Sequence, residues 1–172
     1  PVHSIRRQSE GIYAMLHFLA YEKENGRRHP EWEQKMKNML DILLQLQHAD
    51  GSFPRKFHDD FTVVDDSGGS TPSATLPLIM GYKYFKDKRY LASAKRTADY
   101  LEKVLISKAD YFSSTLDANC EDKEASLYAA TATYYLSLIT KGDEHRHYAD
   151  LARKAAYFAL SWYYVWDVPF AQ

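Results

Sequence analysis

Residues 4–47 read SIRRQSEGIYAMLHFLAYEKENGRRHPEWEQKMKNMLDILLQLQ, and this stretch decides the fold. Its apolar residues recur every three or four positions, which is the period of one face of an α-helix. The first run ends at Asn25-Gly26, where glycine can take the left-handed conformation that closes a helix. A second run follows Pro30, a residue favoured in the first helical turn. The stretch is therefore predicted to form two helices with a short connection, a helical hairpin.

The same pattern occurs twice more along the chain, and strand-like alternation is nowhere sustained. We therefore expect an all-α protein built as a single domain, residues 1–172. The three consecutive antiparallel hairpins are predicted at about residues 4–47, 71–107 and 123–166. Ser70 or Thr71 is the expected N-cap of the second hairpin, and Pro77 should bend its first helix or delay its start.

The connections within hairpins are short, whereas the segments between hairpins, residues 48–70 and 108–122, are long. Because successive helices run in opposite directions, short and long connections must alternate between the two ends of the helical layer. One end is expected to be a plain rim. The other end should carry both long loops, which is where binding and catalysis usually occur.

Composition excludes several classes of function. The chain has 22 lysine and arginine residues against 23 acidic ones, and a net charge of -1 creates no field that would attract nucleic acid. No apolar run approaches the roughly 20 residues of a membrane-spanning helix, so no membrane insertion is expected. Cys120 is the single cysteine, which excludes an internal disulfide and leaves the compartment open. From Pro1 and the abrupt end after an aromatic helix, we expect both termini to be cut from a longer protein.

The first long loop mixes aromatic, histidine, basic and carboxylate side chains. This composition suits a sugar site, because aromatic faces stack on pyranose rings while charged and imidazole groups hydrogen-bond the hydroxyls. The predicted sugar-binding residues are Phe53, Arg55, Phe57 and His58. The alternative is an Ω-like loop in which Phe53, Phe57 and Phe61 pack into the core while the charged groups face solvent.

The second long loop leads directly into the helix predicted to start at residue 123. Asp122 suits the N-cap position of this helix, and Glu124 would be favoured in its first turn by the helix dipole. A carboxylate at this place can also project into a cavity, where partial burial would raise its pKa toward the value that a general acid needs. Both roles stay open for Asp122.

No metal and no cofactor are expected from the sequence. His145 and His147 lie two positions apart near a helix start, so their side chains face different directions. The two adjacent aspartate pairs of the first long loop lack the spacing of a calcium-binding loop. Zinc signatures, phosphate-binding loops of the Walker type and nucleophile elbows are also missing from the sequence.

The phrase LQHADGSF, residues 46–53, resembles the end-of-helix element that α/α-toroid proteins share. Residues 70–91 resemble the sequence pattern of a helical hairpin in bacterial six-hairpin glycosidases, and residues 119–126 resemble a loop-to-helix junction in the same group. The chain thus resembles the six-hairpin glycoside hydrolase superfamily over most of its length, through short motifs. This resemblance implies that the three hairpins are half of an (α/α)6-type toroid.

The resemblance further implies a fragment of a glycoside hydrolase, in which two carboxylates act on a glycosidic bond of a carbohydrate substrate. The candidate catalytic residues on this chain are Asp122, Glu124 and one of Asp65 or Asp66. A half-ring would leave apolar flanks exposed, so self-association through the flanks is also expected. The resemblance favours a periplasmic or secreted location over a cytoplasmic one.

The competing interpretation is a helical-repeat interaction module without catalysis, whose stacked hairpins bind a protein or peptide. Repeats of that kind usually have short loops at both ends, whereas two of the connections here are long. A terpene-cyclase relative would need an Asp-rich diphosphate-binding motif on a helix, which the sequence lacks.

Overall fold

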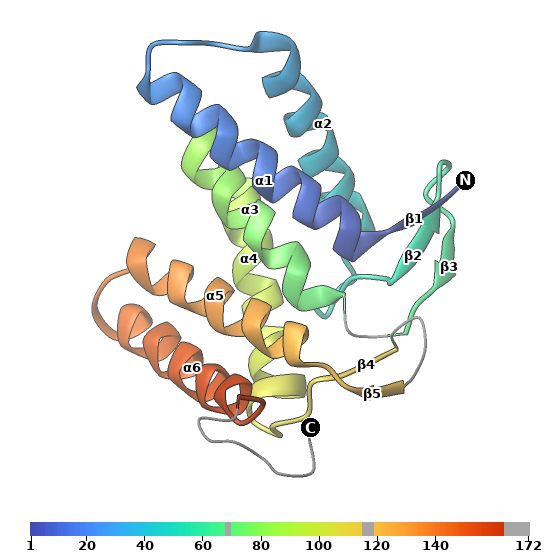
Figure 1. Ribbon diagram of the computed structural model, residues 1–172, viewed down its shortest axis with the longest axis vertical. Helices are drawn as coiled ribbons and strands as arrows, with labels where there is room; N and C mark the ends of the chain where they lie inside the picture. The colour runs from blue at the N-terminus through green and yellow to red at the C-terminus, as the bar shows by residue number, and fades with distance from the viewer. Residues whose placement is uncertain (68–69, 115–118, 164–172) are drawn as a thin grey trace, which may run out of the picture.

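The computed structural model describes residues 1–67, 70–114 and 119–163. Within them the fold is carried by α-helices (Figure 1), with bounds α1 Ile5–Glu24, α2 Pro30–Leu46, α3 Thr71–Phe85, α4 Lys88–Tyr100, α5 Lys123–Ile139 and α6 Gly142–Leu160. A π-helix, Leu101–Ile106, continues α4. The helices pair in chain order as α1/α2, α3/α4 and α5/α6, so the predicted all-α fold of three consecutive hairpins is confirmed.

The first helices of the three hairpins lie side by side, with α3 between α1 and α5 (Figure 1). The second helices, α2, α4 and α6, each pack against the helix that precedes them. The first eleven residues of α3, Thr71–Gly81, are buried throughout. This helix is therefore the centre of the core, and both flanking hairpins pack around it.

The structure can be compared with the predicted start of the second hairpin and the predicted end of the third. α3 starts at Thr71 although Pro77 lies inside it, so Pro77 does not delay the helix start. Ser70 takes the N-cap position of α3, but its side chain makes no capping hydrogen bond; its carbonyl accepts one from Ser73 Oγ at 2.6 Å. α6 ends at Leu160, and the predicted end of the third hairpin at residue 166 lies outside the described residues.

Two small antiparallel sheets add to the helices and were not expected from the sequence. Their strands are β1 Val2–Ser4, β2 Lys56–His58 and β3 Val63–Asp65, in the order β1-β2-β3, and β4 Phe112–Ser114 paired with β5 Asn119–Glu121. Every one of these strands has three residues, which is too short for a period-two pattern to register in the sequence. β1 and β2 pair across more than fifty residues, with Val2 opposite His58.

The described parts of both long loops, with strands β2 to β5, lie at the same end of the molecule, the end where α1, α3 and α5 begin (Figure 1). The short connections at residues 25–29 and 86–87 lie at the opposite end. The backbone N–H of Ile5 donates to the Arg55 carbonyl over 3.0 Å, which ties the first long loop to the start of α1. This arrangement agrees with the prediction that both long loops lie at one end of the helical layer.

The segment LQHADGSF, residues 46–53, connects the first hairpin to the second through hydrogen bonds and a close backbone contact. Gln47 Nε2 donates to Thr97 Oγ1 at 2.9 Å and to the Ser93 carbonyl at 3.1 Å, while Gln47 Oε1 accepts from Ser93 Oγ at 2.7 Å. Gly51 has φ +92°, and a Cβ atom there would lie 2.2 Å from the Arg96 carbonyl oxygen. Only glycine combines this φ with such a close approach to α4. The phrase therefore fixes where the first long loop leaves α2.

Candidate functional site

A polar seam joins α1 to α5 at and beyond the loop-rich end. On α1 the side chains of Arg6, Glu10, Tyr13 and His17 follow the spacing i, i+4, i+7, i+11, which places them on one face of the helix. The facing side chains at the start and along α5 are Asp122, Glu124, Tyr128 and Tyr135. We call these eight residues the polar seam; within it, His17 contacts Tyr13 of its own helix, with ring centroids 4.6 Å apart.

Arg6 is the first link of the seam. Its Nη1 donates to Glu124 Oε2 over 2.9 Å, and its Nη2 donates to Asp122 Oδ2. The guanidinium also lies over the ring of Tyr128, 5.9 Å from the centroid. Burial alone lowers the pKa of Arg6, but hydrogen bonding and attraction from Asp122 and attraction from Glu124 outweigh burial and raise it overall. Arg6 is thus a fixed cation between two carboxylates.

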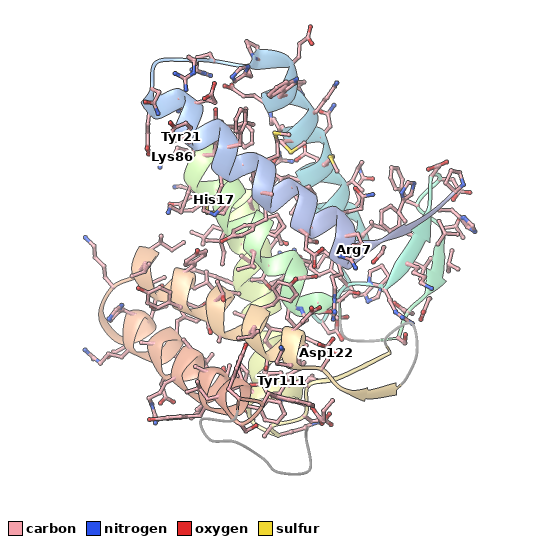
Figure 2. The ribbon with its side chains drawn as sticks, viewed as in Figure 1. Arg7, His17, Tyr21, Lys86, Tyr111 and Asp122 are labelled. Atoms are coloured by element: carbon pink, nitrogen blue, oxygen red, sulfur yellow. The ribbon has the colours of Figure 1, made fainter. Side chains whose placement is uncertain are left out.

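Asp122 performs the capping role that the sequence predicted. Its Oδ1 accepts hydrogen bonds from the backbone N–H groups of Glu124, at 2.8 Å, and Ala125, at 3.2 Å. Figure 2 shows Asp122 at the start of α5, close to the first turns of α1. With Oδ1 on the helix and Oδ2 on Arg6, both oxygens of this buried carboxylate are engaged. Glu124 differs, because its side chain is 58% exposed.

The phenols of the seam are held in hydrogen bonds. Tyr128 Oη donates to Glu10 Oε1 over 2.6 Å, and burial together with this carboxylate raises the pKa of Tyr128. Tyr13 and Tyr135 share a hydrogen bond between their hydroxyl oxygens, 3.0 Å apart. Burial and this bond raise the pKa of Tyr13. Protonated phenols beside carboxylates and an arginine offer donors and acceptors that suit sugar hydroxyls.

A second charged pair from the first long loop lies next to the seam. Arg55 Nη1 donates to Asp65 Oδ2 over 3.0 Å, and the Arg55 carbonyl accepts from Ile5, the residue before Arg6. Asp65 Oδ1 accepts from both the hydroxyl and the backbone N–H of Ser67, at 2.6 and 2.9 Å. The Ser67 hydroxyl first, and then its backbone and Arg55, lower the pKa of Asp65. Asp65 is therefore held as an anion.

The remaining predicted site residues lie elsewhere in the first long loop. Phe53 is 1% exposed and packs in the core. This is the position that the alternative interpretation of the loop, with its phenylalanines packed in the core, predicted for Phe53. Phe57 is also buried, and the exposed His58 lies within 3.0 Å of the Pro1 carbonyl through Nδ1. Asp66 Oδ1 lies 3.3 Å from His48 Nε2. Of the predicted residues, Asp122 and Glu124 meet at Arg6, and the Arg55–Asp65 pair is tied to the start of α1 through the hydrogen bond from Ile5 to the Arg55 carbonyl.

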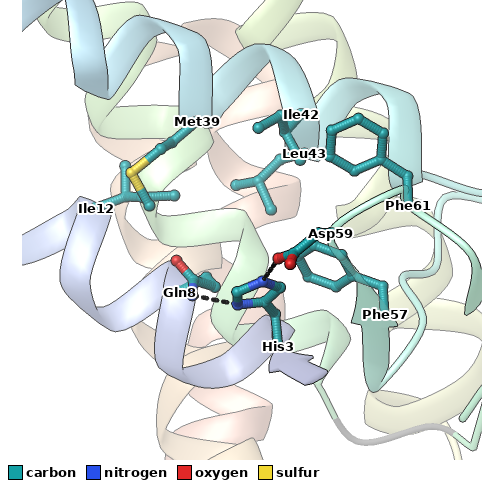
Figure 3. A pocket seen from close by; sticks show the side chains of 9 residues that line it. All are labelled: His3, Gln8, Ile12, Met39, Ile42, Leu43, Phe57, Asp59 and Phe61. Atoms are coloured by element: carbon teal, nitrogen blue, oxygen red, sulfur yellow. Dashed lines mark hydrogen bonds and ion pairs between the residues drawn. The ribbon is translucent and has the colours of Figure 1, made fainter. Parts of the chain in front are cut away.

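A pocket of about 220 Å³ opens beside this cluster, between α1, α2 and the three-stranded sheet (Figure 3). Its polar edge is a chain of hydrogen bonds from Gln8 Nε2 to His3 Nδ1, 3.4 Å, and between His3 Nε2 and Asp59 Oδ1, 2.5 Å. Phe57 and Phe61 stack with centroids 6.5 Å apart and form one wall. The other walls are apolar side chains, namely Ile12, Met39, Ile42 and Leu43. The pocket has the size for one ring and a single hydrogen-bonding edge.

The parts of the chain that the structure describes hold no group of three or more His, Cys, Asp or Glu side chains arranged to bind a metal ion. None of the helices in those parts is long and apolar enough to cross a membrane.

Sequence reasoning missed most of the seam, namely Arg6, Glu10, Tyr13, His17, Tyr128 and Tyr135. A signal for them exists, because each helix carries polar and aromatic residues at i, i+4 and i+7 or i+11 beside its apolar face. That signal becomes specific only when it is known that α1 and α5 face each other.

No protein-family model matches the chain. The structure is similar to that of an unsaturated glucuronyl hydrolase, responsible for the degradation of glycosaminoglycan, from Bacillus sp. GL1, with a TM-score of 0.71 and 13% sequence identity. The superposition covers 91% of this chain and 46% of that chain, so this chain spans about half the length of that enzyme. At this identity the likeness shows the fold alone, an all-α arrangement of helical hairpins that forms part of an (α/α)6-type toroid.

Proposed function

We propose that this chain is part of a glycoside hydrolase and that the polar seam with the adjoining Arg55–Asp65 pair contacts the glycan. The observation that carries the proposal is a gathering of charged and hydrogen-bonding groups where α1 and α5 begin, namely Arg6, Glu10, Asp122, Glu124 and Tyr128, with the Arg55–Asp65 pair tied to the same end. Sugars are recognised by such mixtures of donors, acceptors and aromatic faces. The likeness to a glycosaminoglycan-degrading enzyme supports the same class of substrate.

Three of the four carboxylates, Glu124, Asp65 and Asp122, suit different roles in hydrolysis of a glycosidic bond. Glycosidases use one carboxyl group to transfer a proton to or from the glycosidic oxygen or water, and a second, ionised one as base or nucleophile. Glu124 is the candidate for proton transfer, because its side chain is exposed enough to reach a substrate and Arg6 holds it in place through Oε2. Asp65 suits the ionised role, because Ser67 and Arg55 lower its pKa.

Asp122 has a positioning role in this proposal. Its two oxygens hold the first turn of α5 and the Arg6 guanidinium, and both of these fix Glu124. Asp66, paired with His48, and Phe53, packed in the core, contribute less to the proposed site.

The test measures binding and turnover over a panel of glycans, with glycosaminoglycan-derived oligosaccharides and neutral oligosaccharides in separate arms. Ligand-observed NMR detects binding, and release of new reducing ends detects hydrolysis. The variants are Glu124→Gln and Asp65→Asn, and the matched control is Glu31→Gln, an exposed glutamate in the first turn of α2 at the opposite end.

We expect binding in at least one arm and turnover that falls by about 100-fold or more in each site variant, the usual size of a lost acid or base. The control should keep the turnover of the unaltered chain. Lack of binding by the unaltered chain in both arms, or full turnover in both site variants, would contradict the proposal.

A further inference from the structure

The pocket between α1, α2 and the three-stranded sheet is separate from the polar seam (Figure 3). On α1 it is lined by Gln8 and Ile12, whereas the seam on the same helix uses Arg6 and Glu10. Positions two apart point to nearly opposite sides of an α-helix, so α1 stands between the pocket and the seam. The pocket is therefore a second place on this chain at which a ligand can bind.

The walls of the pocket keep apolar surface open to the cavity. α2 lies less closely against α1 than α6 lies against α5, and the pocket occupies the space between the two helices of this first hairpin. Met39 and Ile42 line it and are only partly buried. A ligand that covers these side chains would remove their apolar surface from water, which favours binding.

One edge of the pocket is polar and presents a hydrogen-bond acceptor. Because the Asp59 carboxylate lies 2.5 Å from His3 Nε2, the neutral imidazole carries its proton on Nε2. His3 Nδ1 is then the acceptor for the amide N–H of Gln8, 3.4 Å away. This orients the amide, and Gln8 Oε1 lies on the side of Ile12 and Met39 (Figure 3). None of the described residues donates a hydrogen bond to Gln8 Oε1, so a ligand can fill that role.

Phe61 closes the pocket from the tip of the β2–β3 hairpin. Its backbone has φ +66°, in the left-handed region that a bulky residue rarely adopts. The turn holds it there, because the N–H of Phe61 donates to the His58 carbonyl and the N–H of His58 donates to the Thr62 carbonyl, both over 2.9 Å. The ring of Phe61 stacks on Phe57 and yet stays 38% exposed. A strained backbone that holds a partly exposed ring over a cavity is typical of a ligand-binding wall.

We propose that the pocket binds a small neutral aromatic ring that carries one hydroxyl group, a phenol. Its volume of about 220 Å³ exceeds the roughly 150 Å³ of an apolar cavity that holds one benzene, which leaves room for a ring and a short substituent. The ring would lie against Phe61 and Met39, and the hydroxyl would donate to Gln8 Oε1. The Asp59 carboxylate at the edge disfavours an anionic ligand.

A sugar ring fits this pocket less well than a phenol. A pyranose carries hydroxyl groups around its edge, whereas the side chains of Ile12, Ile42 and Leu43 offer it no hydrogen bond. Each hydroxyl buried against these walls would lose its bonds to water without a replacement, which costs free energy. One hydroxyl on an otherwise apolar ring matches one acceptor at the edge.

Methyl NMR of the full chain, with isotope-labelled methionine and isoleucine, tests the proposal without any glycan, so its outcome is independent of the proposed hydrolase function. Phenol is the probe. The comparison arms are toluene, which has a methyl group in place of the hydroxyl, and methyl β-D-glucoside. Phenol should shift the methyl signals of Met39, Ile12 and Ile42, which line the pocket. The signal of Met80, which lies on α3 outside the pocket, should stay in place.

Two variants test the wall and the acceptor separately. Phe61→Gly removes the ring, and glycine takes φ +66° without strain, so this variant should fold. Its affinity for phenol should fall by about tenfold or more, whereas the control Phe18→Ala, which removes a similarly exposed ring of α1, should keep the affinity. Gln8→Leu keeps the size of the side chain and removes the acceptor. The ratio of phenol affinity to toluene affinity should therefore fall by about fivefold in this variant, the size of one hydrogen bond. Circular dichroism checks that every variant is folded.

Any of four results would overturn the proposal. The first is that millimolar phenol leaves the signals of Met39, Ile12 and Ile42 in place. The second is an equal affinity for phenol in the unaltered chain and in folded Phe61→Gly. The third is a ratio of phenol to toluene affinity that Gln8→Leu does not change. The fourth is a glucoside that shifts the pocket signals at lower concentration than phenol, which would make the pocket a sugar subsite.

Discussion

Replacement of Asp122 separates its capping role from any chemical role. Asp122→Ala removes the N-cap of α5, which costs about 1 kcal/mol in typical helices. It also removes one carboxylate partner from Arg6, whose side chain is only 18% exposed. Breaking a buried pair costs about 3–5 kcal/mol, but Arg6 retains Glu124, so we assign about 2 kcal/mol to this part. The expected loss in the free energy of unfolding is about 3 kcal/mol in total.

The matched substitution is Asp122→Asn. Asparagine caps helices about as well as aspartate, so this variant keeps the hydrogen bonds to Glu124 and Ala125. Its amide NH2 replaces the oxygen that faces Arg6, so both the charge and the acceptor are lost there. It should lose about 2 kcal/mol, the part assigned to the Arg6 pair. At about 2–4 °C per kcal/mol for a chain of this size, the Tm falls by about 6–12 °C for alanine and about 4–8 °C for asparagine.

Urea unfolding monitored by circular dichroism at neutral pH measures both losses, and the denaturant slope checks that each variant unfolds in the same manner. An alanine variant within about 0.5 kcal/mol of the unaltered chain would refute the reasoning, since that is the range of ordinary surface substitutions. An asparagine variant as unstable as the alanine variant would refute the assignment of the cap, because the charge would then account for the whole effect.

Two further predictions concern a glycine and a buried carboxylate. Gly51→Ala should lower the free energy of unfolding in urea by more than about 2 kcal/mol, because its Cβ would meet the Arg96 carbonyl. The control Gly26→Ala, at φ +76° with open space around it, should lower it by about 1 kcal/mol. Equal losses in the two variants would contradict the close approach at Gly51. Hydrogen bonds from Arg27 and then His29 lower the pKa of Glu22 from 4.5 to about 2, so its contribution to stability is complete above pH 4.5 and disappears as the pH falls toward 2. As the pH falls across this range, the Tm of Glu22→Gln should fall less steeply than the Tm of the unaltered chain, and parallel curves of Tm against pH would contradict this linkage.

The helices were predictable because their signals are local. In the first hairpin, an apolar period of three to four residues, a glycine stop after Asn25 and a proline start at Pro30 all lie within one short stretch. The N-cap at Asp122 was predictable for the same reason, since a cap bonds to residues two and three positions ahead. The common end of the long loops then followed from the alternation of helix directions.

The partners within the site were not predictable, because they are distant in sequence. Arg6 and Glu124 are 118 residues apart, and nothing in the periodicity of α1 says which helix its polar face meets. The first long loop shows the same limit, since its composition favours a sugar site, yet Phe53 packs in the core. Aromatic side chains satisfy both a core and a binding surface, and only the path of the backbone decides between them.

The cost of the seam argues that it serves more than stability. α3 lies between α1 and α5, and its first eleven residues are buried, so apolar packing is available along this wall. The seam instead holds a partly buried arginine between two carboxylates and pairs two half-buried tyrosines. Desolvation offsets much of the attraction in such groups, and apolar residues of similar volume often give equal or greater stability. Charged groups at the loop-rich end, followed by phenols along α1 and α5, are therefore better explained by contact with a polar ligand than by packing.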